Sequence, residues 1–261
     1  MKAQLLQQAA DLLWQAEENN SSCKPVRELF DGSLSIDDAY QIQEINTKRR
    51  LSMGNRIIGR KIGLTSEVVQ KQLGVDQPDF GNIYANMVVM EGETIELKGL
   101  IQPKVEVELA VVLKKDLPHP DTTLLDVIAA IDYVLIAIEV VDSRINNWDI
   151  RIEDTIADNA SSALIVLGQR PYQLSEIDML NTKMSLLADG REVSQGIGRN
   201  CLGNPLIATR WLAQTMAKMG TPIKAGEVIL TGALGPMSAV TEPTSYTAKF
   251  DSYGELTIDF I

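Results

Sequence analysis

Two glutamates, Glu106 and Glu108, alternate with apolar residues in the segment PKVEVELAVVL. A period of two is typical of a β-strand, so both glutamates share one face with Ala110 and Val112, while valines and leucines form the other. Both faces therefore look buried. Two like charges on a buried surface are costly, because each loses hydration and each raises the pKa of the other. We expect a cation between them.

A third carboxylate, Glu139, interrupts the apolar run VLIAIEVV and should be buried too. Three glutamates on two neighbouring strands would offer the oxygen ligands that Mg²⁺ or Mn²⁺ prefers, with the remaining positions left to water or substrate. The pattern predicts an open metal site suited to catalysis. The alternative is a solvated strand face, on which Glu106 and Glu108 would pair with lysines such as Lys104 or Lys114.

The sequence lacks the residues that several other common catalytic sites require. The single histidine, His119, lies between two prolines in a predicted surface loop, which excludes Ser-His-Asp, Cys-His and HExxH sites. Cys23 and Cys201 are far apart in the sequence and form no CxxC pair, which argues against a thiolate zinc site and for a reducing compartment. The sequence has neither a dinucleotide fingerprint nor a Walker A motif. Acid and base chemistry must fall to carboxylates, lysine or metal-bound water.

Three further motifs could contribute polar groups. GRKIGLT places Lys61 between glycines near a predicted strand end, and QPDFG is a proline-set turn that presents Asp79. On spacing alone, both motifs fit surface chemistry better than catalysis. The loop that begins at Thr231 and Gly232 follows a predicted strand and could contact a small anion, although a plain turn fits it equally well.

Hydrophobic periodicity predicts the elements that must position these residues. Helical spacing is found over residues 5–16, and a second helix should begin at the N-cap Ser35 and end near Gly54. A third helix should follow the cap at Asn204 and end at Gly220.

Short apolar runs separated by turn residues begin near Asn82 and predict a β-rich core that ends in a hairpin over residues 246–260. We therefore predict an α+β protein, with a mainly helical N-terminal part over residues 1–80 and a β-rich catalytic core over residues 81–261.

Composition restricts the partners. Of the 261 residues, 45% are hydrophobic and 23% are charged, as expected for a globular protein. The net charge of -11 and the lack of basic clusters argue against nucleic acid and against an anionic membrane surface. No apolar run approaches the roughly 20 residues of a membrane-spanning helix, and the N-terminal sequence lacks the apolar block of a signal peptide. We expect a cytoplasmic protein.

Several long strings are similar to those of the 2-hydroxypenta-2,4-dienoate (2-keto-4-pentenoate) hydratases, members of the fumarylacetoacetate hydrolase superfamily. They are GRKIGLTS, GVDQPDFGNIYANM, IQPKVEVELAVVL, IEVVDSR, DTIADNASS and ILTGALGPM. The resemblance runs in order from about Lys2 to the C-terminus. It implies a mixed β-roll core with a helical N-terminal part, and it implies an enzyme that adds water to a dienol acid in the meta-cleavage degradation of aromatic compounds.

The resemblance also assigns residues. It places Mg²⁺ or Mn²⁺ on the same three glutamates that the burial argument selects, and it assigns active-site roles to Lys61, Asp79 and Ser161, with Thr231 and Gly232 lining the substrate pocket. It further implies a homo-oligomer, and a complex with a related decarboxylase. Two alternatives share these motifs: a 2-oxo-3-hexenedioate (4-oxalocrotonate) decarboxylase, and a non-catalytic partner subunit of such an enzyme.

Overall fold

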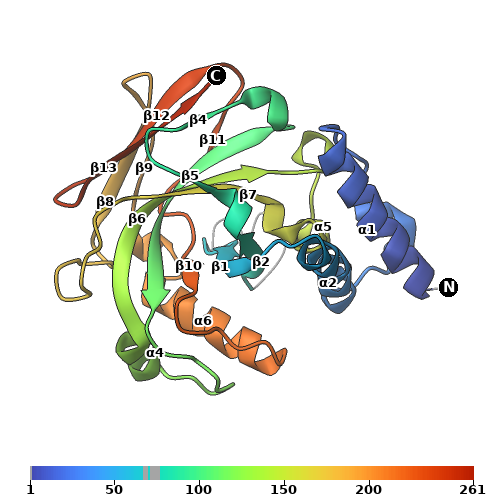
Figure 1. The fold of residues 1–261 in the computed structure, drawn as a ribbon, viewed down its shortest axis with the longest axis horizontal. Helices are drawn as coiled ribbons and strands as arrows, with labels where there is room; N and C mark the ends of the chain where they lie inside the picture. Colours follow the sequence, from blue (N-terminus) through green and yellow to red (C-terminus); the bar gives the residue numbers. More distant parts are fainter. Residues whose placement is uncertain (1, 67–69, 71–76) are drawn as a thin grey trace.

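The computed structural model describes residues 2–66, 70 and 77–261. The larger β-sheet runs through the middle of the molecule and the smaller sheet lies at the upper left, with α1 and α2 on the right and α4 and α6 at the bottom (Figure 1). The strands are β1 (Ile57–Gly63), β2 (Asp79–Tyr84), β3 (Val88–Val89), β4 (Thr94–Ile95), β5 (Pro103–Leu113), β6 (Ile131–Asp142), β7 (Ser162–Leu167), β8 (Lys183–Ala188), β9 (Arg191–Ile197), β10 (Val228–Leu230), β11 (Ser238–Ala239), β12 (Thr244–Phe250) and β13 (Gly254–Phe260).

The three predicted helices are present as α1, α2 and α6, and the structure adds shorter ones. The helices are α1 (Lys2–Glu18), α2 (Ile36–Ser52), α4 (Leu124–Ala130), α5 (Ile152–Ala157) and α6 (Pro205–Lys218), with short 3-10 helices at η1 (Val26–Phe30), η2 (Ala85–Met87), η3 (Leu97–Gly99), η4 (Asn146–Trp148), η5 (Asn159–Ser161) and η6 (Gly198–Asn200). Ser35 caps α2 in a reciprocal capping box with Asp38, as predicted. Asn204 and Pro205 begin α6, also as predicted. None of the described helices is long and apolar enough to cross a membrane.

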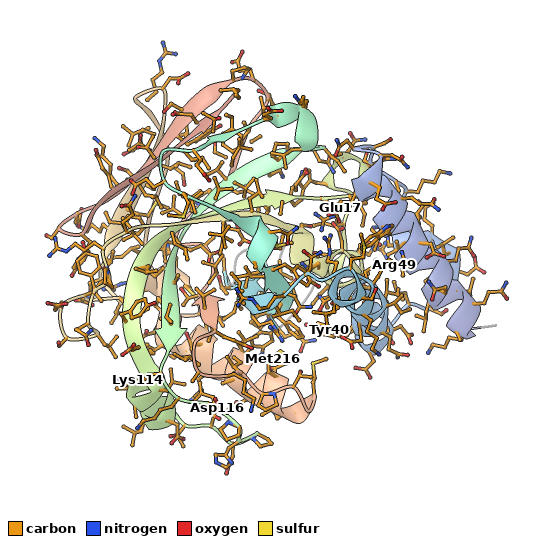
Figure 2. All side chains as sticks on the ribbon, viewed as in Figure 1. Glu17, Tyr40, Arg49, Lys114, Asp116 and Met216 are labelled. Atoms are coloured by element: carbon orange, nitrogen blue, oxygen red, sulfur yellow. The ribbon has the colours of Figure 1, made fainter. Side chains whose placement is uncertain are left out.

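The N-terminal helices form an apolar cluster of their own. Apolar residues of α1 and α2 pack with Ile145 and with Ile152 and Ile156 of α5. Figure 2 shows Arg49 on the side of α2 near α1, where its guanidinium pairs with Asp11 at 2.5 Å. Because α5 joins strands β6 and β7, this helical cluster is packed directly against the segment that connects two central strands.

The larger sheet has eight strands in the order β2-β1-β10-β5-β6-β7-β3, with β11 paired to β5. Neighbours such as β1 and β10 are far apart in sequence, so the sheet gathers motifs from both halves of the chain. The long strands β5 and β6 are antiparallel and form its middle. Both faces of β5 are largely buried, as its pattern predicts.

The smaller sheet has the order β4-β13-β12-β8-β9. Its strands β12 and β13 form the predicted C-terminal hairpin, in which Phe250 pairs with Gly254 across the turn. Alternate residues of both strands are buried. Together with α6 and the face of the larger sheet that carries Val105, Val107 and Leu109, they form one continuous apolar core.

Two sequence expectations need correction. The sheet begins at Ile57 rather than near Asn82, because β1 lies within the range expected to be mainly helical and pairs with β10 and β2. Glycines and charged residues in IIGRKIG hide its strand pattern. In addition, Asp79 is the first residue of strand β2 rather than part of a turn. Pro78 has a fixed φ and disfavours a helical backbone at Gln77, so an extended chain is favoured immediately before the strand begins.

Candidate active site

The three glutamates converge on one face of the larger sheet. Glu106 of β5 lies directly opposite Glu139 of β6 in the antiparallel register, and Glu108 is two residues further along β5. Opposed residues of such a pair have closely spaced side chains. One carboxylate oxygen from each glutamate lies within 4.8 Å of the others. The predicted arrangement on neighbouring strands is confirmed.

Burial makes this cluster suitable for a cation. Glu108 and Glu139 are completely buried, whereas Glu106 is partly exposed and marks the side open to solvent. Within the described part of the chain, Glu108 Oε1 and both carboxylate oxygens of Glu139 lack a hydrogen-bond partner. Buried carboxylates without partners are costly, and a divalent ion would supply the missing ligand interactions. The set therefore fits a hard metal ion, and a solvated glutamate face is wrong.

Lys61 provides the positive charge beside the triad. Its strand β1 is separated from β6 by β10 and β5, yet Lys61 Nζ lies 3.3 Å from Glu139 Oε1. The ammonium also donates a hydrogen bond to the Ala160 carbonyl oxygen at 3.1 Å. Burial lowers the pKa of Lys61, but nearby carboxylates, Glu139 above all, outweigh burial and raise this pKa above its ordinary value. Lys61 is therefore a charged ammonium.

Asp79 lies on β2 opposite Gly63 of β1, two residues along the strands from the pair of Lys61 and Gly81. The residue is 1% exposed, and neither of its carboxylate oxygens has a hydrogen-bond partner among the described residues. Burial raises the pKa of Asp79, and Lys61 opposes this effect in part. Gly63 makes room for the carboxylate, because a Cβ at position 63 would lie only 2.1 Å from Asp79 Oδ1. A buried carboxylate with a raised pKa and free lone pairs can accept a proton.

The remaining predicted residues lie around the same site. The Gly232 amide donates a hydrogen bond to Glu108 Oε2 at 2.7 Å, and the Thr231 hydroxyl donates to the Leu109 carbonyl at 2.8 Å. Gly232 has a φ of +113°, and a Cβ there would lie 2.3 Å from Thr65 Oγ1. This position therefore requires glycine. Ser161 lies in the turn that contacts Lys61, and its hydroxyl faces Asp158 Oδ2 at 3.3 Å.

Sequence reasoning missed three residues at or near this site: Gly63, Arg144 and Asp158. Arg144 and Asp158 are 6% and 3% exposed and form an ion pair at 2.5 Å. Both belong to the strings IEVVDSR and DTIADNASS, but charged residues beside polar neighbours look like surface positions. The need for glycine at position 63 could not be predicted from sequence spacing either, because a side chain there would collide with Asp79 on another strand.

Most of the chain matches a known protein family. The family model for the fumarylacetoacetate hydrolase C-terminal domain matches residues 58–258. A 2-keto-4-pentenoate hydratase from Burkholderia vietnamiensis is 52% identical over 95% of this chain and 94% of its own length. This chain belongs to the 2-keto-4-pentenoate hydratase family. A second family member, from Paraburkholderia phymatum, is 49% identical over 98% of this chain and 97% of its own.

A decarboxylase of known structure is also similar to this chain. The 4-oxalocrotonate decarboxylase from Pseudomonas putida G7, complexed with magnesium and adipate, superimposes with a TM-score of 0.96. It is 34% identical, and the match covers 100% of this chain and 98% of the decarboxylase. The hydratase family therefore shares its whole fold with a decarboxylase, and residues in the site must decide between the two reactions.

Proposed function

We propose that this chain adds water to 2-hydroxypenta-2,4-dienoate (2-oxopent-4-enoate) to give 4-hydroxy-2-oxopentanoate, in the meta-cleavage degradation of aromatic compounds. A divalent ion, Mg²⁺ or Mn²⁺, is held by Glu106, Glu108 and Glu139. The observation that carries this proposal is the buried cluster of carboxylates with unpartnered oxygens beside a charged lysine. Near full-length similarity to named hydratases selects hydration among the reactions such a site could perform.

The ion would supply Lewis-acid polarisation of the 2-oxygen of the substrate. Lys61 stabilises the negative charge that develops on this oxygen during ketonisation, since its ammonium is buried and fixed in position. It also offsets part of the negative charge of the three glutamates. These roles require Lys61 to remain protonated in the free enzyme, in agreement with the raised pKa caused by its carboxylate neighbours.

Asp79 is the proposed general base for hydration. Its carboxylate takes a proton from the attacking water as oxygen adds to C4 of the substrate, and its free lone pairs leave it able to do so. Ser161 is the proposed hydrogen-bond donor to the substrate, for which its hydroxyl would turn away from Asp158. Thr231 and Gly232 line the pocket, and the Gly232 amide additionally orients Glu108.

The proposal extends to the setting of the enzyme. We place it in the cytoplasm, where two free cysteines remain reduced. We further propose a homo-oligomer that can associate with a related decarboxylase, as the sequence resemblance implies.

The second candidate function is decarboxylation of 2-oxo-3-hexenedioate. The structural match to the decarboxylase favours it, because the two folds agree over the whole chain. The same site would polarise the 2-oxo acid, but a second cation would be needed for the distal carboxylate of the substrate.

One experiment separates the two candidates. Purified protein with Mg²⁺ is offered 2-hydroxypenta-2,4-dienoate and 2-oxo-3-hexenedioate in separate reactions, and the products are identified by NMR. We expect 4-hydroxy-2-oxopentanoate from the first substrate and little conversion of the second. Preferential loss of carbon dioxide from the second substrate would make the chain a decarboxylase, and turnover of neither would indicate a non-catalytic subunit.

The crowding of carboxylates also makes a prediction about stability. Metal-free Glu108→Gln should be at least as stable as the metal-free wild type at pH 8, although its Mg²⁺ affinity should fall. Burial, Glu139 and Glu106 raise the pKa of Glu108 well above its ordinary 4.5, so its charged form destabilises the folded state. The wild type recovers this stability as the pH falls through the raised pKa, because the carboxyl group then takes up a proton.

The advantage of Glu108→Gln should therefore shrink towards pH 5. Urea unfolding in EDTA at pH 8 and pH 5 measures the difference in unfolding free energy between the variant and the wild type. A metal-free variant much less stable than the metal-free wild type at pH 8 would show that the carboxylate stabilises the folded protein, against the crowding described above.

A further inference from the structure

The turn that contacts Lys61 has an unusual backbone. Asn159, Ala160 and Ser161 have φ values of 54°, 51° and 53°, so three consecutive residues other than glycine adopt the left-handed conformation. Such residues adopt it rarely and mostly singly, because Cβ then crowds the backbone. Asparagine tolerates it best, whereas alanine has no polar group to compensate. Other parts of the protein must therefore hold this turn.

The turn is docked closely against strands β1 and β2. The Ala160 carbonyl accepts the hydrogen bond from Lys61 Nζ at 3.1 Å. The Asn159 side chain accepts from the Asn82 amide at 2.8 Å and donates to the Asn82 carbonyl at 2.9 Å. A Cβ at Gly81 would lie 2.2 Å from the Asn159 carbonyl oxygen, so the two backbones are in contact. A shift of the turn would therefore move the acceptor that fixes the Lys61 ammonium.

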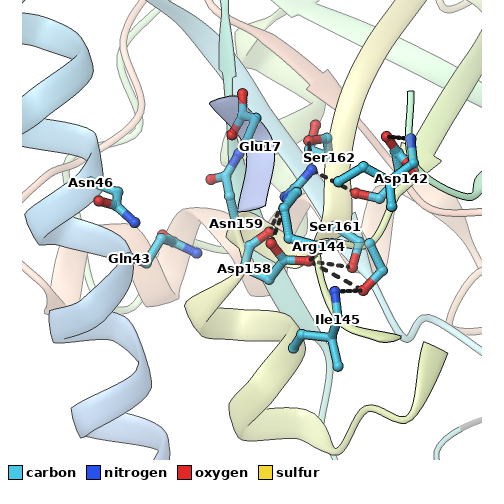
Figure 3. A network of polar contacts seen from close by, with 12 residues as sticks. Glu17, Gln43, Asn46, Asp142, Arg144, Ile145, Asp158, Asn159, Ser161 and Ser162 are labelled. Carbon is cyan, nitrogen blue, oxygen red and sulfur yellow. Dashed lines mark hydrogen bonds and ion pairs between the residues drawn. The ribbon is translucent and has the colours of Figure 1, made fainter. Parts of the chain in front are cut away.

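A buried ion pair lies on the other side of the turn (Figure 3). Arg144 Nε donates to Asp158 Oδ1 at 2.5 Å, and Arg144 also donates to the carbonyl oxygens of Asp142, Asp158 and Ser162 at 2.6, 2.5 and 3.2 Å. Asp142 is the last residue of β6, Asp158 directly precedes the turn and Ser162 directly follows it. One guanidinium thus ties together the segments on both sides of the turn.

Asp158, which directly precedes the turn, completes this arrangement. Its Oδ2 accepts hydrogen bonds from the Arg144 amide at 3.1 Å and from the Ser161 hydroxyl at 3.3 Å. The carboxylate therefore links Arg144 to Ser161, the last residue of the left-handed segment. It also supplies the charge that a buried guanidinium requires, since an unpaired buried ion is strongly destabilising.

We propose that Arg144 and Asp158 are positioning residues for catalysis, which hold the left-handed turn so that the Ala160 carbonyl keeps the Lys61 ammonium beside Glu139. The inference rests on the proposed role of Lys61 in hydration. Neither residue contacts the three glutamates in the structure, so their effect is transmitted through the turn.

Two substitutions test the proposal, Asp158→Asn and Arg144→Lys. An asparagine at position 158 would point amide hydrogens at the Arg144 and Ser161 donors that the Asp158 carboxylate accepts from. A lysine at position 144 lacks the planar guanidinium that donates to three carbonyl oxygens at once. We expect kcat for hydration to fall about 10²-fold in both, the usual cost of displacing a catalytic group by about 1 Å. The Mg²⁺ affinity, measured by calorimetry, should change little because the three glutamates remain in place.

Asp154→Asn is the matched control. Asp154 is also a fully buried carboxylate and lies in α5 four residues before Asp158, but among the described residues its side chain bonds to Arg27 and the Arg151 amide rather than to the turn. This variant should lose stability while kcat remains near that of the wild type. An equal loss of kcat in Asp154→Asn would assign the effect to general destabilisation and would overturn the proposal.

Rescue by glycine distinguishes positioning from other effects of Asp158. Ala160→Gly makes the left-handed backbone accessible without cost to Cβ. In the Asp158→Asn background it should restore kcat by about tenfold, the equivalent of the left-handed penalty of one residue. Failure of Ala160→Gly to restore any activity to a folded double variant would contradict a role through the turn.

A readout independent of turnover keeps this test separate from the proposed function. Acetylation of Lys61 by acetic anhydride, followed by peptide mass spectrometry, should be slow in the wild type, where the residue is 3% exposed. It should be faster in Asp158→Asn and Arg144→Lys, and unchanged in Asp154→Asn. If the wild type shows no hydratase activity but labelling follows this order, the proposed function fails and the positioning of Lys61 stands. Unchanged labelling in all variants would overturn the positioning.

Discussion

Lys61→Met should lower kcat for hydration about 10³-fold while Mg²⁺ binds as tightly as in the wild type or more tightly. The loss is that expected when a buried, preorganised charge no longer stabilises developing negative charge. The gain in Mg²⁺ affinity follows because the ammonium lies 3.3 Å from Glu139 Oε1 and repels a cation held by the same carboxylates. Steady-state kinetics and calorimetry measure the two quantities.

Lys114→Met provides the control for Lys61→Met. Lys114 directly follows β5 but is exposed, so removal of its charge should leave kcat within about fivefold of the wild type. If Lys61→Met retained more than a tenth of the wild-type kcat, electrostatic stabilisation would have to come from other groups. If it lost Mg²⁺ binding, Lys61 would serve to maintain the site rather than the reaction.

Asp79→Asn should separate the two stages of the reaction. Asp79 is proposed to act only on water, so the variant should bind Mg²⁺ normally and still incorporate deuterium from D₂O at C3 or C5 of the substrate. Hydration should slow by about 10²-fold or more, the usual contribution of a general base. NMR follows exchange and hydration in one sample.

Gly63→Ala gives an independent approach to the same carboxylate. The added methyl group would collide with Asp79 Oδ1 at 2.1 Å and displace the carboxylate without removing it. Hydration should again slow more than exchange. Equal loss of both processes in Asp79→Asn, with Mg²⁺ bound, would mean that Asp79 serves the proton transfers of ketonisation and that Lys61 or metal-bound water activates the nucleophile.

The sequence predicted those parts of the site that lie within one or two continuous strands. Alternation placed Glu106 and Glu108 on one face, and the interrupted apolar run identified Glu139. The capping signals of α2 and α6 and the alternation of the C-terminal hairpin were equally local, and all are confirmed. Local periodicity is sufficient where burial on one face determines which residues alternate.

Parts that depend on contacts between distant segments could not be predicted in this way. Lys61 of β1 meets Glu139 of β6 although β10 and β5 lie between these strands, so the contact depends on the strand order and curvature of the sheet, which no sequence spacing specifies. The space at Gly63 is needed by Asp79 on another strand. The left-handed turn that begins at Asn159 is bound by Arg144, which lies fifteen residues earlier in the chain. The division at residue 80 stays a prediction, and β1 already belongs to the larger sheet on the other side of that boundary.

Hydration should require one divalent ion on the three glutamates. The most direct test removes all metal by exhaustive chelation, confirms the removal by elemental analysis, and then titrates Mg²⁺ while the initial rate of hydration is measured at each ratio of ion to chain. Glu139→Gln, titrated in the same way, tests the ligand set. We expect no activity without metal, an increase that saturates at one ion per chain, and no comparable increase in the variant. Full activity in the metal-free wild type would show that hydration does not require an ion on the three glutamates.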